Sequence, residues 1–105
     1  MIIQGTNIPL VVTFDGSVTD CAALVITLWH RNRTELKRWT MADMVINADI
    51  VTLPVSEEET AAWPEGYNTM EAKGLDADGS TIFWEEIPVL VVSRRDKGIR
   101  LQEDE

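Results

Sequence analysis

Short runs of β-branched and apolar residues make up most of the chain, and turn signals separate them at spacings of about 8 to 14 residues. This pattern is typical of a β-sandwich or β-barrel, and no long segment shows the periodicity of a helix. About seven such runs in 105 residues match the size of an immunoglobulin-like domain. We therefore predict an all-β, immunoglobulin-like β-sandwich of about seven strands with one short helical turn.

A single domain is expected, because a chain of 105 residues can bury roughly 65% of its unfolded surface without disulfides or metal. Hydrophobic residues make up 45% of the chain, which is typical of globular rather than disordered proteins. The sandwich is expected over residues 1–93. Residues 94–105 are charged and lack periodicity, so they are predicted to form a C-terminal tail.

Alternating apolar residues predict the individual strands. The run 22–31 carries apolar side chains on both faces, which favours a central strand, whereas 35–39 is short and charged, as in an outer strand. Pro9 places the first strand at a sheet edge or just before a strand begins, and Pro88 predicts a break or bulge in the last run. The expected strands cover residues 8–14, 22–31, 35–39, 44–46, 51–55 and 66–74, and two segments of the run 82–92.

Two capping signals indicate helical turns. The spacing Thr-x-x-Asp over residues 40–43 is that of a helix cap, so a single turn is expected there. Ser56 and Glu59 form a capping box, in which the serine hydroxyl accepts from the first turn and the glutamate reaches back to the serine amide. A short helix is therefore predicted over residues 57–62, ended by Pro64.

The charge balance excludes one class of partner. The chain carries 18 acidic residues against 9 Lys and Arg, so its net charge is −9 and no nucleic-acid partner is expected, because that role needs a basic stripe. The opening residues lack the basic start and apolar run of a signal peptide, and the longest apolar run, Ile87–Val92, is too short to cross a membrane. No membrane partner is expected either. Cys21 is the single cysteine, so no internal disulfide can form.

The charges also divide into clusters along the chain. Cations gather at 31–38 and 94–100, whereas residues 39–93 hold 11 acidic residues and one cation, Lys73. A surface polarised in this way can set the register between identical or different subunits, although solvated charge runs explain the same pattern.

No catalytic or metal-binding motif is found, so we predict a protein that is not an enzyme and that needs no cofactor or metal. His30 is the single histidine and lies inside an expected strand, which favours a structural role over a hydrolytic triad. Glu85 and Glu86 are adjacent on a strand and face opposite sides, so they cannot share an acid–base site. The run from Asp76 begins like a calcium loop but has Thr81 where such a loop needs glycine.

Tryptophan is the strongest sign of a binding surface in this sequence, because its side chain dominates interface hot spots and also stacks on sugars. Trp63 and Trp84 are the better candidates, since Pro64 and Glu85 flank them. A sandwich also buries large aromatics in its core, and both interpretations stay open here. The candidate interaction surface comprises Trp63, Trp84, Trp39, Arg94 and Arg95.

Four segments of the chain resemble known phage proteins. They are Gly5–Leu10, Leu24–Trp29, Asp49–Pro54 and Glu59–Tyr67. Their order and spacing are similar to those of small prophage structural proteins of gut Firmicutes and, more distantly, of the N-terminal immunoglobulin-like domain of phage upper baseplate proteins. The likeness covers residues 2 to 97.

This resemblance implies a β-sandwich with an assembly role in a phage tail or baseplate, first in the host cytoplasm and then in the virion. The implied partners are other tail or baseplate proteins, or copies of the chain itself, and no catalytic residue is carried over. In that family a helical turn leads into a Pro-x-Gly-Tyr corner. Pro64, Gly66 and Tyr67 match it here, and the motif is similar to a tyrosine corner.

Two other functions compete with assembly through edge strands and aromatic patches, which is the leading hypothesis. A carbohydrate-binding or adhesion module would use exposed tryptophans to stack on a host sugar. An acidic inhibitor that mimics nucleic acid would need carboxylates along one face, whereas several here lie on opposite faces or in turns.

Overall fold

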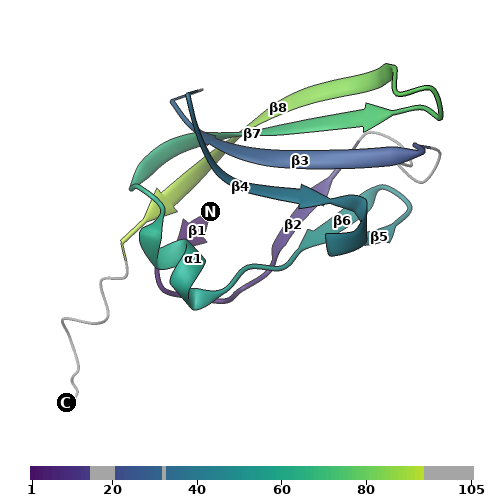
Figure 1. Ribbon diagram of the computed structural model, residues 1–105. Coiled ribbons are helices and arrows are strands. Elements are labelled where there is room, and N and C mark those ends of the chain that lie inside the picture. The colour runs from purple at the N-terminus through teal and green to yellow at the C-terminus, as the bar shows by residue number, and fades with distance from the viewer. Residues whose placement is uncertain (15–20, 32, 94–105) are drawn as a thin grey trace, which may run out of the picture.

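Two β-sheets stacked face to face form the body of the protein (Figure 1). The computed structural model describes residues 1–14, 21–31 and 33–93, and the predicted tail, with Arg94 and Arg95, lies outside these residues. The prediction of an all-β fold is confirmed. The strands are β1 (Ile2–Ile3), β2 (Leu10–Thr13), β3 (Ala23–His30), β4 (Thr34–Thr40), β5 (Val45–Asn47), β6 (Ile50–Leu53), β7 (Gly66–Leu75) and β8 (Thr81–Val92). The larger sheet has the order β1-β8-β7-β3-β4 and the smaller sheet β2-β6-β5.

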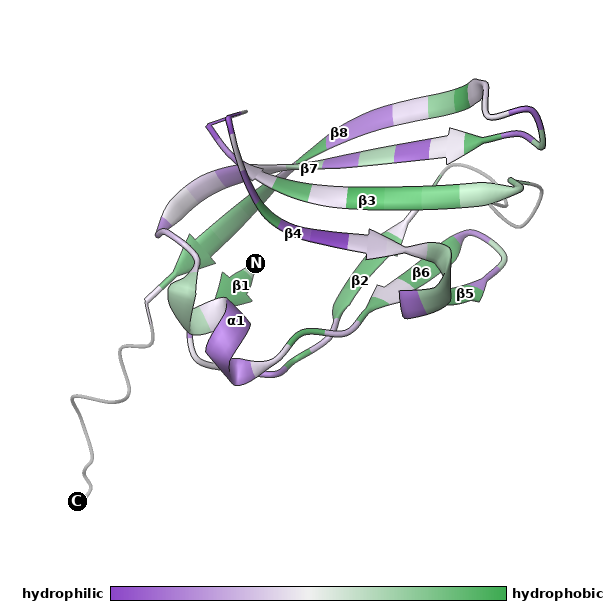
Figure 2. Ribbon diagram, in the orientation of Figure 1, coloured by the Kyte–Doolittle hydropathy of each residue, from purple (hydrophilic) through white to green (hydrophobic). Residues whose placement is uncertain are grey.

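Side chains from the facing sides of the two sheets meet in one core. In β3, Leu24, Ile26 and Leu28 are fully buried, because alternate residues of a strand point to the same side. Figure 2 shows the hydrophobic residues that run along β3. Other members of the core are Met70 and Ala72 of β7, Val51 and Leu53 of β6, Val91 of β8, Trp39 of β4, and Trp63.

Three strand placements predicted from the sequence are confirmed. β3 is central in its sheet, since β7 pairs with one side of it and β4 with the other. The short charged run 35–39 lies in β4, an edge strand of the larger sheet. Pro9 directly precedes β2, which is an edge strand of the smaller sheet.

The predicted break at Pro88 is wrong. β8 is a single uninterrupted strand, and Pro88 pairs with Thr69 of β7. Proline is tolerated because β8 lies near the sheet edge, where the missing N–H can face away from β7. The irregularity lies near the start of β8 instead: Gly74 and Leu75 of β7 pair with Phe83 and Thr81, so Ile82 is an extra residue in β8.

The described residues form eight strands: the two segments expected within 82–92 form one strand, β8, and β1 was not predicted. This strand pairs in parallel with Val91 and Val92 at the end of β8. Two residues are too few to show the alternation by which strands are predicted.

A short helix, α1 (Glu57–Ala62), lies near β1 at one end of the molecule (Figure 1). Ser56 Oγ accepts from the Glu59 N–H at 3.1 Å, and the Ser56 N–H donates to Glu59 Oε1 at 3.0 Å. The capping box and the helix predicted over 57–62 are therefore confirmed. The turn predicted over 40–43 is the 3₁₀ helix η1 (Met41–Asp43).

Polar contacts tie the N-terminal segment to α1. The hydroxyl of Thr60, which is fully buried, donates to the Thr6 carbonyl at 2.7 Å and accepts from the Thr6 N–H at 3.0 Å. The Gln4 side-chain amide donates to the Trp63 carbonyl at 2.7 Å. These three hydrogen bonds hold the chain that follows β1 against the helix.

The corner between α1 and β7 is held differently from the predicted tyrosine corner. Gly66 has a φ of +103°, as the sharp turn after Pro64 requires. The Tyr67 side chain is 73% exposed, so its hydroxyl does not reach back into the fold. Asn68 is buried in its place: its amide donates to the Pro64 carbonyl at 3.1 Å, and its Oδ1 lies 2.8 Å from His30 Nδ1.

Gly74 gives a first testable prediction. A Cβ added there would lie 2.3 Å from Phe83 Cδ1 and 2.7 Å from Cys21 Sγ, and the Phe83 ring packs edge-on against Phe14. We expect Gly74→Ala to lower the free energy of unfolding by about 1 to 3 kcal/mol through overpacking, as measured by urea denaturation. The loss of stability caused by Gly74→Ala should be smaller when Phe83 is replaced by Leu. An equal loss in that background would contradict the close contact between position 74 and the Phe83 ring.

The ion pair between Lys37 of β4 and Glu59 of α1 gives a second prediction. The hydrogen bond from Lys37 holds the pKa of Glu59 below its usual 4.5. The stability that this pair contributes is present above pH 4.5 and is lost as pH falls through the lowered pKa. Glu59→Gln keeps the capping box but removes the charge, so it should lower stability at pH 7 and weaken the acid dependence of unfolding.

The matched control for this measurement is Glu58→Gln, which removes a neighbouring exposed charge on the same helix. Equal acid dependence in the two variants would show that the pair with Lys37 contributes nothing to stability.

Candidate functional site

The side of the larger sheet that faces away from the smaller one carries aromatic and charged side chains. Strand alternation puts these residues on the side opposite the core. Register then brings them together, since Thr27 of β3 pairs with Glu71 of β7, and Lys73 of β7 pairs with Trp84 of β8. We call this surface the outer sheet face, and it comprises Val25, Thr27, Trp29, Arg38, Glu71, Lys73, Trp84 and Glu86.

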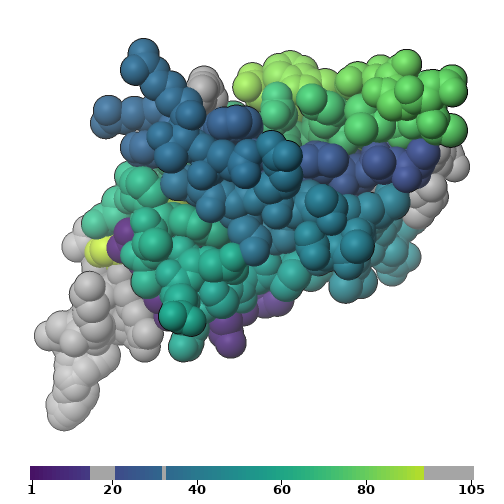
Figure 3. Space-filling model, in the orientation of Figure 1, coloured from purple at the N-terminus to yellow at the C-terminus, as the bar shows by residue number. Residues whose placement is uncertain are grey.

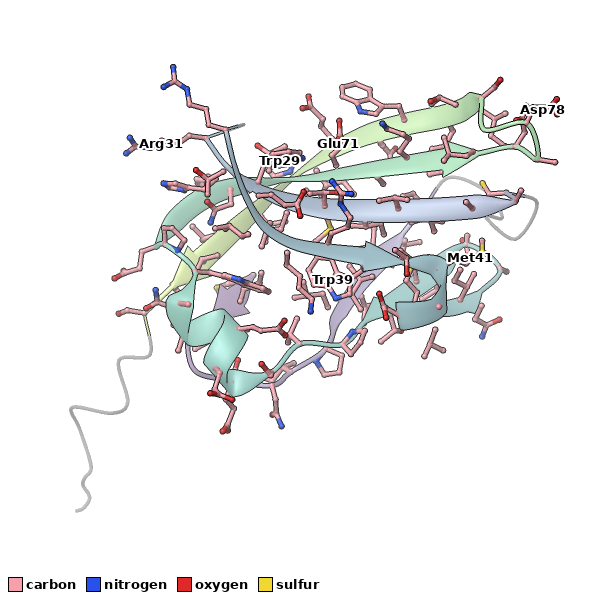
Figure 4. All side chains as sticks on the ribbon, in the orientation of Figure 1. Trp29, Arg31, Trp39, Met41, Glu71 and Asp78 are labelled. Atoms are coloured by element: carbon pink, nitrogen blue, oxygen red, sulfur yellow. The ribbon has the colours of Figure 1, made fainter. Side chains whose placement is uncertain are left out.

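One carboxylate on the outer sheet face accepts hydrogen bonds from two indoles. Trp84 Nε1 donates to Glu71 Oε2 at 2.7 Å, and Trp29 Nε1 donates to Glu71 Oε1 at 3.4 Å, a longer and weaker contact. Figure 4 shows Trp29 and Glu71 on the side of the larger sheet away from β2 and β6, whereas Trp39 points between the layers. Glu71 therefore fixes the orientation of an exposed tryptophan.

A hollow of about 260 Å³ adjoins this cluster. Val25, Trp29 and Leu75 supply apolar groups to its lining, while Arg38 and Lys73 supply positive charge and Glu71 negative charge. Such a combination suits the contact of an aromatic or apolar group surrounded by polar ones. The hollow is lined by Val25, Thr27, Trp29, Arg38, Glu71, Lys73 and Leu75.

The tryptophans of the predicted interaction surface divide between surface and core. Trp84 is 52% exposed and lies on the outer sheet face. Trp39 and Trp63 are buried, at 1% and 3% exposure, so their expected place on the surface is corrected. Their rings pack edge to face with centroids 6.3 Å apart, and Trp39 Nε1 donates to the Pro54 carbonyl at 2.8 Å.

Trp29 and Glu71 were not predicted as site residues. One signal for Trp29 was present, because alternation put it on the face of its strand opposite the Leu24 side. Glu71 gave no local signal, since its role depends on the pairing of β7 with both β3 and β8.

The structure places the titratable side chains that the sequence analysis considered. Within the described residues no group of three His, Cys, Asp or Glu side chains could hold a metal ion. His30 Nδ1 lies 2.8 Å from the buried Asn68, so its role is structural. Glu85 pairs with Ala72 and Glu86 with Glu71, which puts the two carboxylates on opposite faces of the sheet.

Neither helical segment in the described part of the chain has the length and apolar character needed to span a membrane.

Comparison of the chain with protein-family models, with curated proteins and with solved structures finds no match.

The different burial of Trp39 and Trp84 gives a third prediction, on the stability of their alanine variants. Trp39→Ala should lower the free energy of unfolding by about 3 to 5 kcal/mol, because it empties part of the core. Trp84→Ala should cost far less, since half of that side chain already contacts solvent. Urea denaturation of both variants tests this, and equal losses would contradict the assignment of Trp84 to the surface.

Proposed function

We propose that this protein is a non-enzymatic structural component of a prophage tail or baseplate, and that it works through protein–protein contact. Its sheets are proposed to form an immunoglobulin-like sandwich, and its location is proposed to be the virion. Support comes from the four segments that resemble small prophage structural proteins and from the stacked five-stranded and three-stranded sheets.

The outer sheet face is the observation that carries the proposal. Trp84 is half exposed, and its bond to Glu71 orients the ring before any partner arrives. A tryptophan held in this way loses little conformational freedom on binding, which favours it as an interface hot spot. Tyr67 and Ile82, on the same two strands, are also exposed and extend the apolar area.

Charged side chains around Trp84 can select one partner and set its orientation. Arg38 and Lys73 lie on the same face as Glu71 and Glu86, so positive and negative groups alternate across neighbouring strands. Such a pattern adds little affinity at an exposed rim, but it fixes the orientation of a partner and disfavours wrong ones.

The fourth prediction tests assembly. Multi-angle light scattering of the full chain at high concentration, and binding to purified prophage tail and baseplate proteins, should reveal association. Trp84→Ala should weaken that association about tenfold or more, as expected for a hot-spot residue. Val45→Ala removes a similarly exposed apolar side chain from the smaller sheet and should have little effect. A strict monomer without affinity for neighbouring tail proteins would overturn the proposal.

A carbohydrate-binding function is the second candidate, favoured by the hollow beside the two tryptophans. Sugars stack on exposed aromatic rings and bond to nearby carboxylates, and Trp84 and Glu71 supply both groups. A glycan array separates the two functions: binding that disappears in Trp84→Ala supports this candidate, and an array without signal removes it.

A further inference from the structure

β8 leaves most of one side without a pairing strand. It has 12 residues, and β1 pairs with only Val91 and Val92 on that side. β7 occupies the other side along nearly the whole strand. No other described residue pairs with residues 81–90, so the larger sheet has a vacant edge position in line with β1.

The direction of the free backbone groups follows from one hydrogen bond. The Gln4 N–H donates to the Val92 carbonyl at 2.9 Å, so the backbone polar groups of Val92 point away from β7, toward the vacant side. Successive residues of a strand point their N–H and C=O groups to opposite sides. The backbone polar groups of Trp84, Glu86 and Pro88, which lie an even number of residues from Val92, therefore also point toward the vacant side. An added strand would find donors and acceptors at Trp84 and Glu86, and an acceptor alone at Pro88.

A groove of about 550 Å³ lies beside this edge. Residues 9–13, in and just before the edge strand β2, line one side of it, and residues 85–89 of β8 line the other. The groove thus opens between the two sheets, directly onto the core. Its apolar lining includes Leu10, Val12, Met70, Ile87 and Val89, all of which belong to the core or pack against it.

The opposite side of the molecule is covered by the chain itself. β4 continues through η1 into β5, so this connection joins the larger sheet to the smaller one. Figure 3 shows the side chains of β4, η1 and α1 lying together over that side. The sandwich is therefore closed on the β4 side and leaves a strand-sized opening between β8 and β2.

Charge indicates which strand can enter the opening. Among the described residues that line the groove, Glu85 and Glu86 carry charged side chains, and Met1 also lies in the lining. A second β8 edge would bring its own two glutamates, so like charges hinder pairing of β8 with β8. A strand with Lys or Arg would instead be attracted. In this chain, residues 94–100 carry four cations against one acid.

The end of this basic segment carries two apolar residues that an extended strand would place on one side, Ile99 and Leu101. Arg95 and Lys97 share that side, where Glu85 lines the groove, and Arg100 lies on the other side with Glu86. We propose that residues 94–101 of a second copy of this chain bind in the groove as an added strand of the larger sheet.

A second copy is favoured over the chain's own segment by the position of β1. This strand occupies the edge beside Val91 and Val92, which is where the chain leaves β8. A segment that follows directly would have to pass around β1 before it could reach residues 85–89. Reciprocal exchange between two copies closes a two-fold dimer, whereas a one-way, head-to-tail contact produces rings or filaments.

The proposal rests on the assembly function proposed above, and a charge reversal tests it in the full-length protein. Arg100→Glu and Glu86→Lys should each weaken self-association about tenfold, as measured by light scattering at low salt. The double variant should recover it, because the pair is restored with opposite polarity. Glu58→Lys makes the same charge change on α1 and serves as the matched control.

A synthetic peptide of residues 94–101 provides a second measurement. Fluorescence anisotropy should show that the labelled peptide binds the full chain, and that Glu86→Lys weakens this binding while Glu58→Lys does not. A peptide that does not bind, or that binds both variants equally, would overturn the proposal, as would a full chain that stays monomeric at high concentration.

Glu86 belongs to both proposed contact surfaces, so Arg100→Glu and the recovery in the double variant separate the exchanged strand from the outer sheet face. Association that depends on Trp84 but is unchanged by Arg100→Glu and Glu86→Lys would support the outer sheet face and overturn the exchanged strand. Association that depends on the charge pair but survives Trp84→Ala would support the exchanged strand and overturn the outer sheet face as the contact.

Discussion

Burial of the inner side of β3 between the two sheets is the contact on which the rest of the structure depends. Leu24, Ile26 and Leu28 have no exposed surface, and they fix which way every other residue of that strand points. A shift of one residue would put these three side chains in solvent, so the register with β4 and β7 is strongly specified. The positions of Trp29 and of its partner Glu71 on the opposite side follow from this register.

Capping residues and strand alternation, which can be recognised within a few consecutive residues, were enough to predict individual helices and strands. The helix 57–62 follows from the capping box of Ser56 and Glu59, and β3 follows from alternation. Alternation assigns residues to two faces but does not tell which face a second sheet will cover. Trp63 and Trp84 were therefore ranked alike as surface candidates, although Trp63 is buried and Trp84 is half exposed. Glu71 acquires its role only through pairing with strands that are distant in sequence.

The two proposed contact surfaces use different parts of the chain. The outer sheet face offers side chains whose orientation is set by Glu71, so its specificity depends on shape and charge. The edge of β8 offers backbone groups, which any extended segment can pair with, and its selectivity comes from Glu85, Glu86 and Pro88. One domain of this design could join a lateral neighbour and an axial neighbour at the same time.

The parallel pairing of β1 with β8 has a consequence for synthesis on the ribosome. Ile2 is made 89 residues before its partner, Val91. At 5 to 20 residues per second this delay is roughly 5 to 20 s, a long wait for a contact of such high sequence separation. During that time the nascent chain carries β1 without its partner, and the pairing forms only when the end of β8 emerges.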